Sequence, residues 1–202
     1  MGVQITKRAG EIAKRLKNGN LAPTMRRVSK YLVSSAIGKI NKGVSPENAP
    51  LTKEVKQGDK TLRDNGQLMA SIAPQNGNDW ALAQTNLAYA KINQEGGTIS
   101  GKGKGLWLPA SAETRRLMRK YNAQKPGELI EAMKGDGYSF FRRGKVFCAK
   151  KKKGKPFAVF IIKQQVKIPA RPFLYIDESD EKHINKEIKK AVHEALKGDG
   201  KK

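Results

Sequence analysis

Apolar residues recur at helical spacing in three parts of the chain. After Pro23, which suits a first helical turn, one apolar face runs up to Gly43. Its members are Met25, Val28, Leu32, Ala36 and Ile40. A similar spacing runs from Ile5 to Leu16 and ends at Gly19, and a stripe from Ile184 to Leu196 repeats every four residues. We therefore predict a helical N-terminus over residues 1–43, made of two helices, and a C-terminal helix over about 179–197.

The middle of the chain has a pattern typical of strands. Asn-Gly at 76–77 separates apolar segments at 71–74 and 80–85, which predicts a hairpin. Residues 138–149 and 156–168 are rich in β-formers, and Gly144 divides the first run into a second hairpin. Apolar residues occupy both sides of 157–162. That segment is predicted to be buried on two faces, or buried on one of them by another subunit.

Shorter elements complete the prediction. Helices are expected at 62–72, 89–92, 111–121 and 126–134, and loops at 44–61 and 100–105. This order predicts an α+β fold with a mostly antiparallel sheet packed by the N- and C-terminal helices. We expect one domain over 1–202, with 98–167 as a basic insertion or extended arm and 168–198 as a connector and C-terminal helix.

The segment 168–174, Ile-Pro-Ala-Arg-Pro-Phe-Leu, is the most informative feature of the chain, because two prolines restrict its backbone. Each proline fixes its own φ and favours an extended residue before it. A stiff connector is therefore expected to deliver Phe173 and Leu174 to a packing site. Arg171, between the prolines, has two interpretations: an intrachain pair that pins the connector, or a bond to a carboxylate or carbonyl cluster across a subunit boundary.

Three segments together resemble the phage virion morphogenesis family, the tail-completion or neck proteins of contractile-tailed phages such as Mu and P2. They occur in the family's order, at 61–72 (TLRDNGQLMASI), 87–97 (LAYAKINQEGG) and 168–174 (IPARPFL). The residues that carry the resemblance are Leu62, Asp64, Gly66, Leu68, Ser71 and Ile72, then Tyr89, Ala90, Gln94, Gly96 and Gly97, then Pro169, Ala170, Arg171, Pro172, Phe173 and Leu174.

The resemblance implies a structural protein of the virion. Such a protein would form a ring, expected to be hexameric, at the head-proximal end of the tail and would help join the tail to the capsid. Its expected partners are copies of itself and the neighbouring neck, connector and tail-tube or terminator proteins. Assembly would take place in the host cytoplasm, and the product would belong to the neck of the virion.

Charge adds a second hypothesis. The chain has a formal net charge of +23, and residues 101–170 hold 18 basic and 4 acidic side chains, whereas 51–100 hold five of each. This asymmetry favours an anionic partner. The candidate anion contacts are Lys150, Lys151, Lys152, Lys153 and Lys155. The alternatives are a basic nucleic-acid-binding protein that contacts DNA phosphates through 101–167, an acidic protein surface within the assembly, and a solvated face.

The sequence offers little catalytic chemistry, and we expect no enzyme, no metal and no cofactor. Cys148 is the single cysteine, and His183 and His193 would lie about 15 Å apart along one helix, too far to share a metal. The carboxylates fall in predicted caps and turns. An apolar run of about 18 residues and a signal-peptide centre are both missing, so we expect no membrane span.

Overall fold

The computed structural model describes residues 3–8, 20–56, 58, 60–101, 103 and 105–198. The chain forms two compact units. The first unit comprises residues 1–46, 60–96 and 169–202, and the second comprises 47–59 and 97–168. The second unit thus contains the stretch 98–167 that was expected as an insertion or arm. That the chain acts as one domain stays a prediction.

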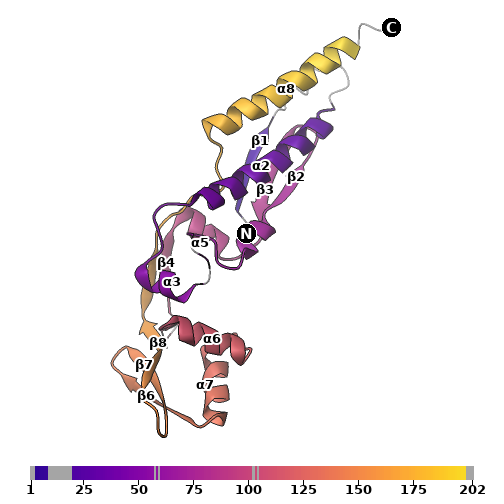
Figure 1. The fold of residues 1–202 in the computed structure, drawn as a ribbon. Helices are drawn as coiled ribbons and strands as arrows, with labels where there is room; N and C mark the ends of the chain where they lie inside the picture. The colour runs from indigo at the N-terminus through magenta and orange to yellow at the C-terminus, as the bar shows by residue number, and fades with distance from the viewer. Residues whose placement is uncertain are drawn as a thin grey trace. The chain divides into compact units, whose positions relative to one another are not determined.

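The first unit is built on a three-stranded antiparallel sheet of order β1-β3-β2. Its strands are β1 (Val3–Arg8), β2 (Ala73–Asn76) and β3 (Trp80–Thr85), and its helices are α2 (Ala22–Lys42), α4 (Gln67–Ser71), α5 (Ala90–Glu95) and α8 (Glu178–Gly198). Helix α2 packs against β2 and β3, and α8 lies beside α2 (Figure 1). The predicted Asn-Gly hairpin is confirmed, since the Gly77 N–H donates to the Trp80 carbonyl over 2.9 Å.

The apolar face predicted for α2 forms the centre of this unit. The helix begins with a proline in its first turn and ends at Gly43, and all five predicted residues are at most 1% exposed. Phe173, Leu174, Ile184 and Ile188 join the same core from the connector and α8. Burying side chains of this size stabilises a fold by about 2 kcal/mol each, so these contacts hold the two long helices on the sheet.

The prediction of a helix from Ile5 was wrong for the residues that the structure describes there. Residues 3–8 form β1, which pairs with β3 in the register Val3↔Thr85 to Arg8↔Trp80. The segment Val-Gln-Ile-Thr alternates apolar and polar residues and contains β-branched ones, which pair well with an available strand edge. The remainder of that predicted helix, residues 9–19, lies outside the described residues.

Two further boundaries differ from the prediction. Residues 44–61 are not all loop, because a short helix, α3 (Pro50–Val55), begins at a proline. The helix predicted over 62–72 starts only at Gln67, since Leu62 and Gly66 have φ values of +62° and +81°. Backbone in that left-handed region ends or precedes a helix and does not continue it.

The second unit contains a four-stranded antiparallel sheet of order β5-β8-β7-β6 and a separate two-stranded ribbon of β4 and β9. The strands are β4 (Gly97–Ser100), β5 (Leu106–Pro109), β6 (Tyr138–Arg143), β7 (Val146–Lys151), β8 (Phe157–Lys163) and β9 (Gln165–Ile168). Helices α6 (Ala112–Lys120) and α7 (Pro126–Gly135) follow β5. The α+β prediction is therefore confirmed, and the strand expected over 156–168 divides at Gln164.

This unit has its own hydrophobic core. Leu129 and Met133 of α7 and Val159 and Phe160 of β8 are fully buried, and Leu117 of α6 joins them. The Thr114 hydroxyl donates to the Val159 carbonyl over 2.9 Å, which ties α6 to β8. Residues 97–168 therefore include a folded core of sheet and helices.

Candidate functional site: the junction of the three motifs

The connector enters the first unit with three side chains buried and three exposed. Arg171, Phe173 and Leu174 are buried, at 7%, 0% and 3% exposure. Pro169, Ala170 and Pro172 are exposed. Phe173 and Leu174 pack in the same core as α2, Leu68 and Ile72, as the sequence predicted for a packing site.

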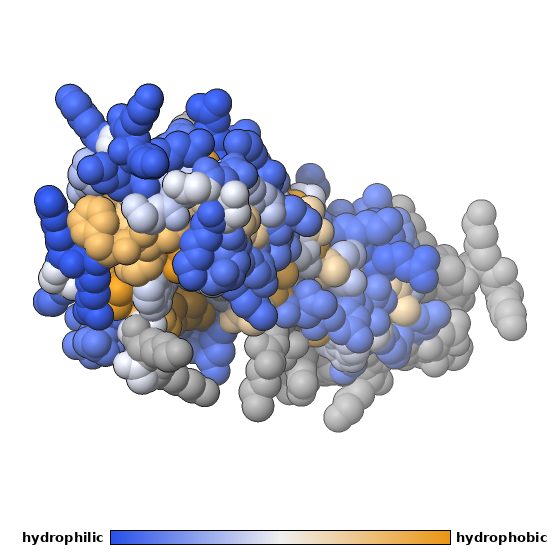
Figure 2. Space-filling view, turned by 90° about the horizontal axis from the view of Figure 1, so that it is seen from below, coloured by the Kyte–Doolittle hydropathy of each residue, from blue (hydrophilic) through white to orange (hydrophobic). Residues whose placement is uncertain are grey.

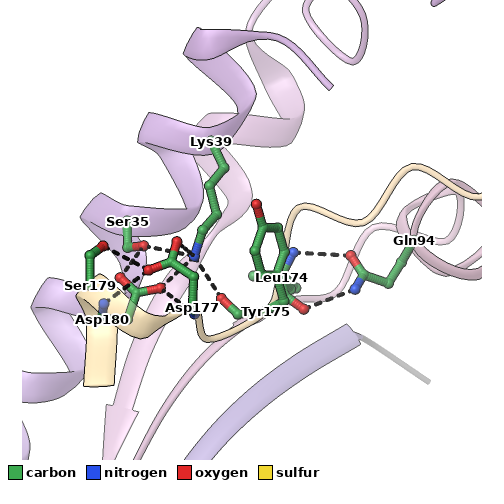
Figure 3. A network of polar contacts seen from close by, with 8 residues as sticks. All are labelled: Ser35, Lys39, Gln94, Leu174, Tyr175, Asp177, Ser179 and Asp180. Atoms are coloured by element: carbon green, nitrogen blue, oxygen red, sulfur yellow. Dashed lines mark hydrogen bonds and ion pairs between the residues drawn. The ribbon is translucent and has the colours of Figure 1, made fainter. Parts of the chain in front are cut away.

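Gln94 of the second motif holds the backbone of this connector. Its Oε1 accepts hydrogen bonds from the N–H groups of Phe173 and Leu174, both at 3.0 Å. Its Nε2 donates to the Leu174 carbonyl over 2.8 Å (Figure 3). One side-chain amide thus satisfies three backbone groups at a place where two buried apolar side chains enter the core. Buried backbone groups need such partners, so Gln94 fixes the connector's path.

Arg171 holds the connector from its other end. Its backbone N–H donates to the Asn93 carbonyl and its Nε donates to the Pro46 carbonyl, both over 2.7 Å. Burial lowers the pKa of its guanidinium. These bonds lie within the first unit and pin the connector, as the first interpretation expects, and a bond across a subunit boundary stays a prediction.

The first motif forms a turn followed by α4. The Asn65 Oδ1 accepts the Gln67 N–H over 3.2 Å just before the helix, and Asp64 lies in the bend before it. The Ser71 hydroxyl lies 2.7 Å from the hydroxyl of Thr85 in β3. Leu68 and Ile72 are buried, and Leu62 is partly buried against the same core.

The first and second motifs also meet electrostatically. Burial raises the pKa of the Tyr89 phenol, and the charge of Asp64 raises it further. Tyr89 is 41% exposed and precedes α5, whose first residue, Ala90, is fully buried. Gly96 ends α5 at φ +75° and Gly97, at φ +152°, begins β4. Of the predicted residues, the structure therefore brings the three motifs to one junction, whereas Lys150–Lys153 and Lys155 belong to the second unit.

A charged network that the sequence did not predict lies beside the junction (Figure 3). Lys39 of α2 contacts Asp180 at 2.5 Å and Asp177 at 3.3 Å, and it donates to the Tyr175 carbonyl over 2.7 Å. The Ser35 hydroxyl donates to Asp180 over 2.6 Å. The only signal in the sequence was the cluster of acidic residues at the start of α8. Lys39 and Asp180 are 141 positions apart, and nothing in a single sequence identifies them as a pair.

The same two aspartates cap α8. The Asp177 carboxylate accepts the Asp180 N–H and the Asp180 carboxylate accepts the Asp177 N–H, both at 3.0 Å. The Ser179 hydroxyl and the Asp180 N–H hold the pKa of Asp177 well below its usual range. Burial opposes ionisation of Asp180, but bonds from Lys39 and Ser35 outweigh it and lower the pKa of that carboxyl too. Both groups are therefore ionised near neutral pH.

An open pocket of about 620 Å³ lies next to this network. Tyr175, Pro172, Lys42 and the 43–45 turn line it. The Lys39 ammonium sits 4.1 Å from the centre of the Tyr175 ring, so this exposed tyrosine is held in place. The arrangement can hold a chain segment rigidly, but within the described part of the chain no group of three or more His, Cys, Asp or Glu could hold a metal.

Replacing Gln94 by alanine is expected to lower the free energy of unfolding by about 2 kcal/mol, because buried backbone groups of Phe173 and Leu174 lose their partner. Urea denaturation measures the loss, and amide exchange at these two residues should accelerate. The matched control is Gln75→Ala, an exposed glutamine bonded to Gln84, which should change stability by less than about 0.5 kcal/mol. Equal losses in both variants would contradict the role of Gln94.

Asp180→Asn is expected to cost about 3 kcal/mol of stability at pH 7, because it leaves the largely covered Lys39 ammonium, whose side chain is 10% exposed, without its main partner. The exposed control Glu178→Gln, which loses only its pair with Lys182, should cost under about 0.5 kcal/mol.

The lowered pKa of Asp180 stabilises the fold above the ordinary aspartate pKa of about 3.9, and this contribution is lost on acidification below it. Denaturation at pH 3–7 should give a shallower acid dependence for Asp180→Asn than for wild type.

Comparison with known proteins places these residues in a family. The family model described as the phage virion morphogenesis family matches residues 2–123, which is more than half of the chain. The match includes the first two motifs and ends before the third. No match was found among curated proteins or among solved structures. In the described part of the chain, no helix is long and apolar enough to cross a membrane. On the strength of the family match, the chain belongs to the phage virion morphogenesis family.

Proposed function

We propose that this protein is a structural component of the neck, or tail-completion region, of a contractile-tailed phage. It would assemble as a ring, expected to be hexameric, at the head-proximal end of the tail and join the tail to the capsid. Its neighbours would be neck, connector and tail-tube or terminator proteins, and it would remain in the virion after assembly in the host cytoplasm. We also propose that the protein is not an enzyme. Membership of a virion morphogenesis family is the observation that carries this proposal.

The β4–β9 ribbon supports self-association. Among the described residues these two strands pair only with each other, so each has an outer edge with backbone groups that another strand could pair with. All four residues of β4 are exposed, and Ile99 is a large apolar side chain at 40% exposure. Two-stranded ribbons are marginally stable alone. A neighbouring subunit that added a strand would stabilise this one.

Size-exclusion chromatography with light scattering should give a ring-sized oligomer, and electron microscopy of purified particles should place the chain at the neck. Ile99→Lys is expected to weaken self-association at least tenfold, because it puts a charge on the apolar face of the ribbon. The neighbouring Thr98→Lys adds the same charge on the opposite face and is the control. A protein that is strictly monomeric in solution and missing from finished particles would contradict the proposal.

The second candidate function is DNA binding through the second unit. Lys150–Lys153 and Lys155 are all exposed around the turn between β7 and β8. From Tyr138 to Ile168 the sequence has ten basic residues and no acidic one. By contrast, α8 interleaves its lysines with glutamates, as in the 2.8 Å pair of Lys182 and Glu178. The uncompensated charge of 138–168 is the observation that favours a polyanion.

Duplex DNA binding, measured by fluorescence anisotropy, should weaken steeply between 50 and 200 mM salt if lysines contact phosphates. Reversing Lys150, Lys152 and Lys153 to glutamate should weaken binding more than tenfold. The control reverses Lys186, Lys189 and Lys190 on α8, which are equally exposed, and should change affinity far less. Tight binding that survives the first set of reversals would exclude this turn as the DNA contact.

A further inference from the structure

The four-stranded sheet of the second unit has one covered face. Directly paired residues, and alternate residues along a strand, lie on the same face of a sheet. Trp107, Phe147 and Phe160 share one face, and the Trp107 ring lies 5.0 Å from that of Phe147 and 5.7 Å from that of Phe160. These three pack in the core together with residues of α6 and α7. This face is therefore covered from within the chain.

The opposite face is also apolar at its centre. The register aligns Leu108, Ile161 and Val146 in one row across β5, β8 and β7. Leu106 and Phe141 lie on the same face, and all five side chains are only partly buried. None of the five belongs to either hydrophobic core. We call these five residues the open face. In Figure 2 an apolar patch framed by hydrophilic side chains is visible on this unit.

Cations border the open face. Arg143 continues the row of Val146, Lys163 pairs with Leu106, and Lys150 lies two positions beyond Cys148 on the same side of β7. All three are exposed, and the Arg143 guanidinium lies 5.4 Å from the centre of the Phe141 ring. The stretch 138–168 supplies no carboxylate to balance them. The open face is therefore an apolar centre with a basic rim.

The size of this face fits one helix. A row across four strands spans about 14 Å, since neighbouring strands lie about 4.8 Å apart. A helix with its side chains is about 10–12 Å wide. Stable domains cover an apolar sheet face with a second layer, and helices already cover the other side of this sheet. A single helix with an apolar stripe would complete the layer.

The rim selects the charge of that helix. We propose that the open face binds an amphipathic helix of another protein, with carboxylates on both sides of its apolar stripe. A second copy using the same face would place Arg143 and Lys163 of each copy against those of the other, which costs energy. Nucleic acid is disfavoured at the centre, because four of its five residues are aliphatic and offer no stacking surface. The inference does not require ring formation, since a monomer carries the same face.

A fluorescein-labelled synthetic 18-residue helix with leucines at helical spacing and glutamates elsewhere tests this by anisotropy on the full-length protein. It should bind at least tenfold more tightly than a scrambled peptide of the same composition and than its lysine counterpart. Arg143→Glu with Lys163→Glu, both at exposed positions, should weaken binding at least tenfold. Ile161→Ser with Val146→Ser should do the same, with circular dichroism checking that the fold persists. Lys189→Glu with Lys190→Glu on α8 is the matched control and should leave affinity unchanged.

Three results would overturn the proposal. The first is equal affinity for the stripe peptide and its scrambled form, which would reduce the face to a general cation surface. The second is stronger competition by a DNA duplex than by unlabelled peptide, which would make it a nucleic-acid contact. The third is the dissociation of an oligomer by the double substitution Ile161→Ser with Val146→Ser, measured by light scattering. That result would assign the face to a second copy of the chain. The ring proposal is tested separately through Ile99, so the two failures are distinguishable.

Discussion

The fold of the first unit depends on how one glutamine side chain satisfies the connector's backbone. Prolines make the connector stiff but remove backbone donors, and burial of Phe173 and Leu174 takes the remaining donors away from water. Gln94 supplies both an acceptor and a donor at that point. Because the amide stands at the end of α5, the position of α5 determines where the connector enters the core.

The position of α8 follows from the same constraint. Leu174 is held by Gln94, and three residues later Asp177 begins the reciprocal cap of α8. Lys39 then joins that cap to α2 and also binds the carbonyl of Tyr175. With both ends of this short segment anchored, α8 has little freedom to slide along α2. Its apolar stripe, Ile184 and Ile188, is thereby kept in register with the α2 core.

Local signals in the sequence were enough for elements whose cause is local. Pro23 and Gly43 delimit α2, and Asn-Gly makes the hairpin, because both act through nearby backbone. The burial of Phe173 also followed from its position after Pro172. Strand β1 could not be predicted, since it depends on an edge of β3 more than seventy positions away. The Lys39–Asp180 pair was missed for the same reason. The sequence pattern of an amphipathic helix does not distinguish a lysine that forms an ion pair from one that is exposed to solvent.

The register of the β4–β9 ribbon explains how the chain combines a family fold with a strongly basic region. Gly97 pairs with Ile168, so the first and last residues of the stretch 97–168 in the second unit lie side by side in the ribbon. Residues between them can change in length or charge without altering the path of the second motif before Gly97 or of the connector after Ile168. The uncompensated cations and the open face both lie in this stretch, whereas Gln94 and Arg171 lie outside it. The surfaces proposed for binding in the second unit can therefore vary while the junction of the motifs stays the same.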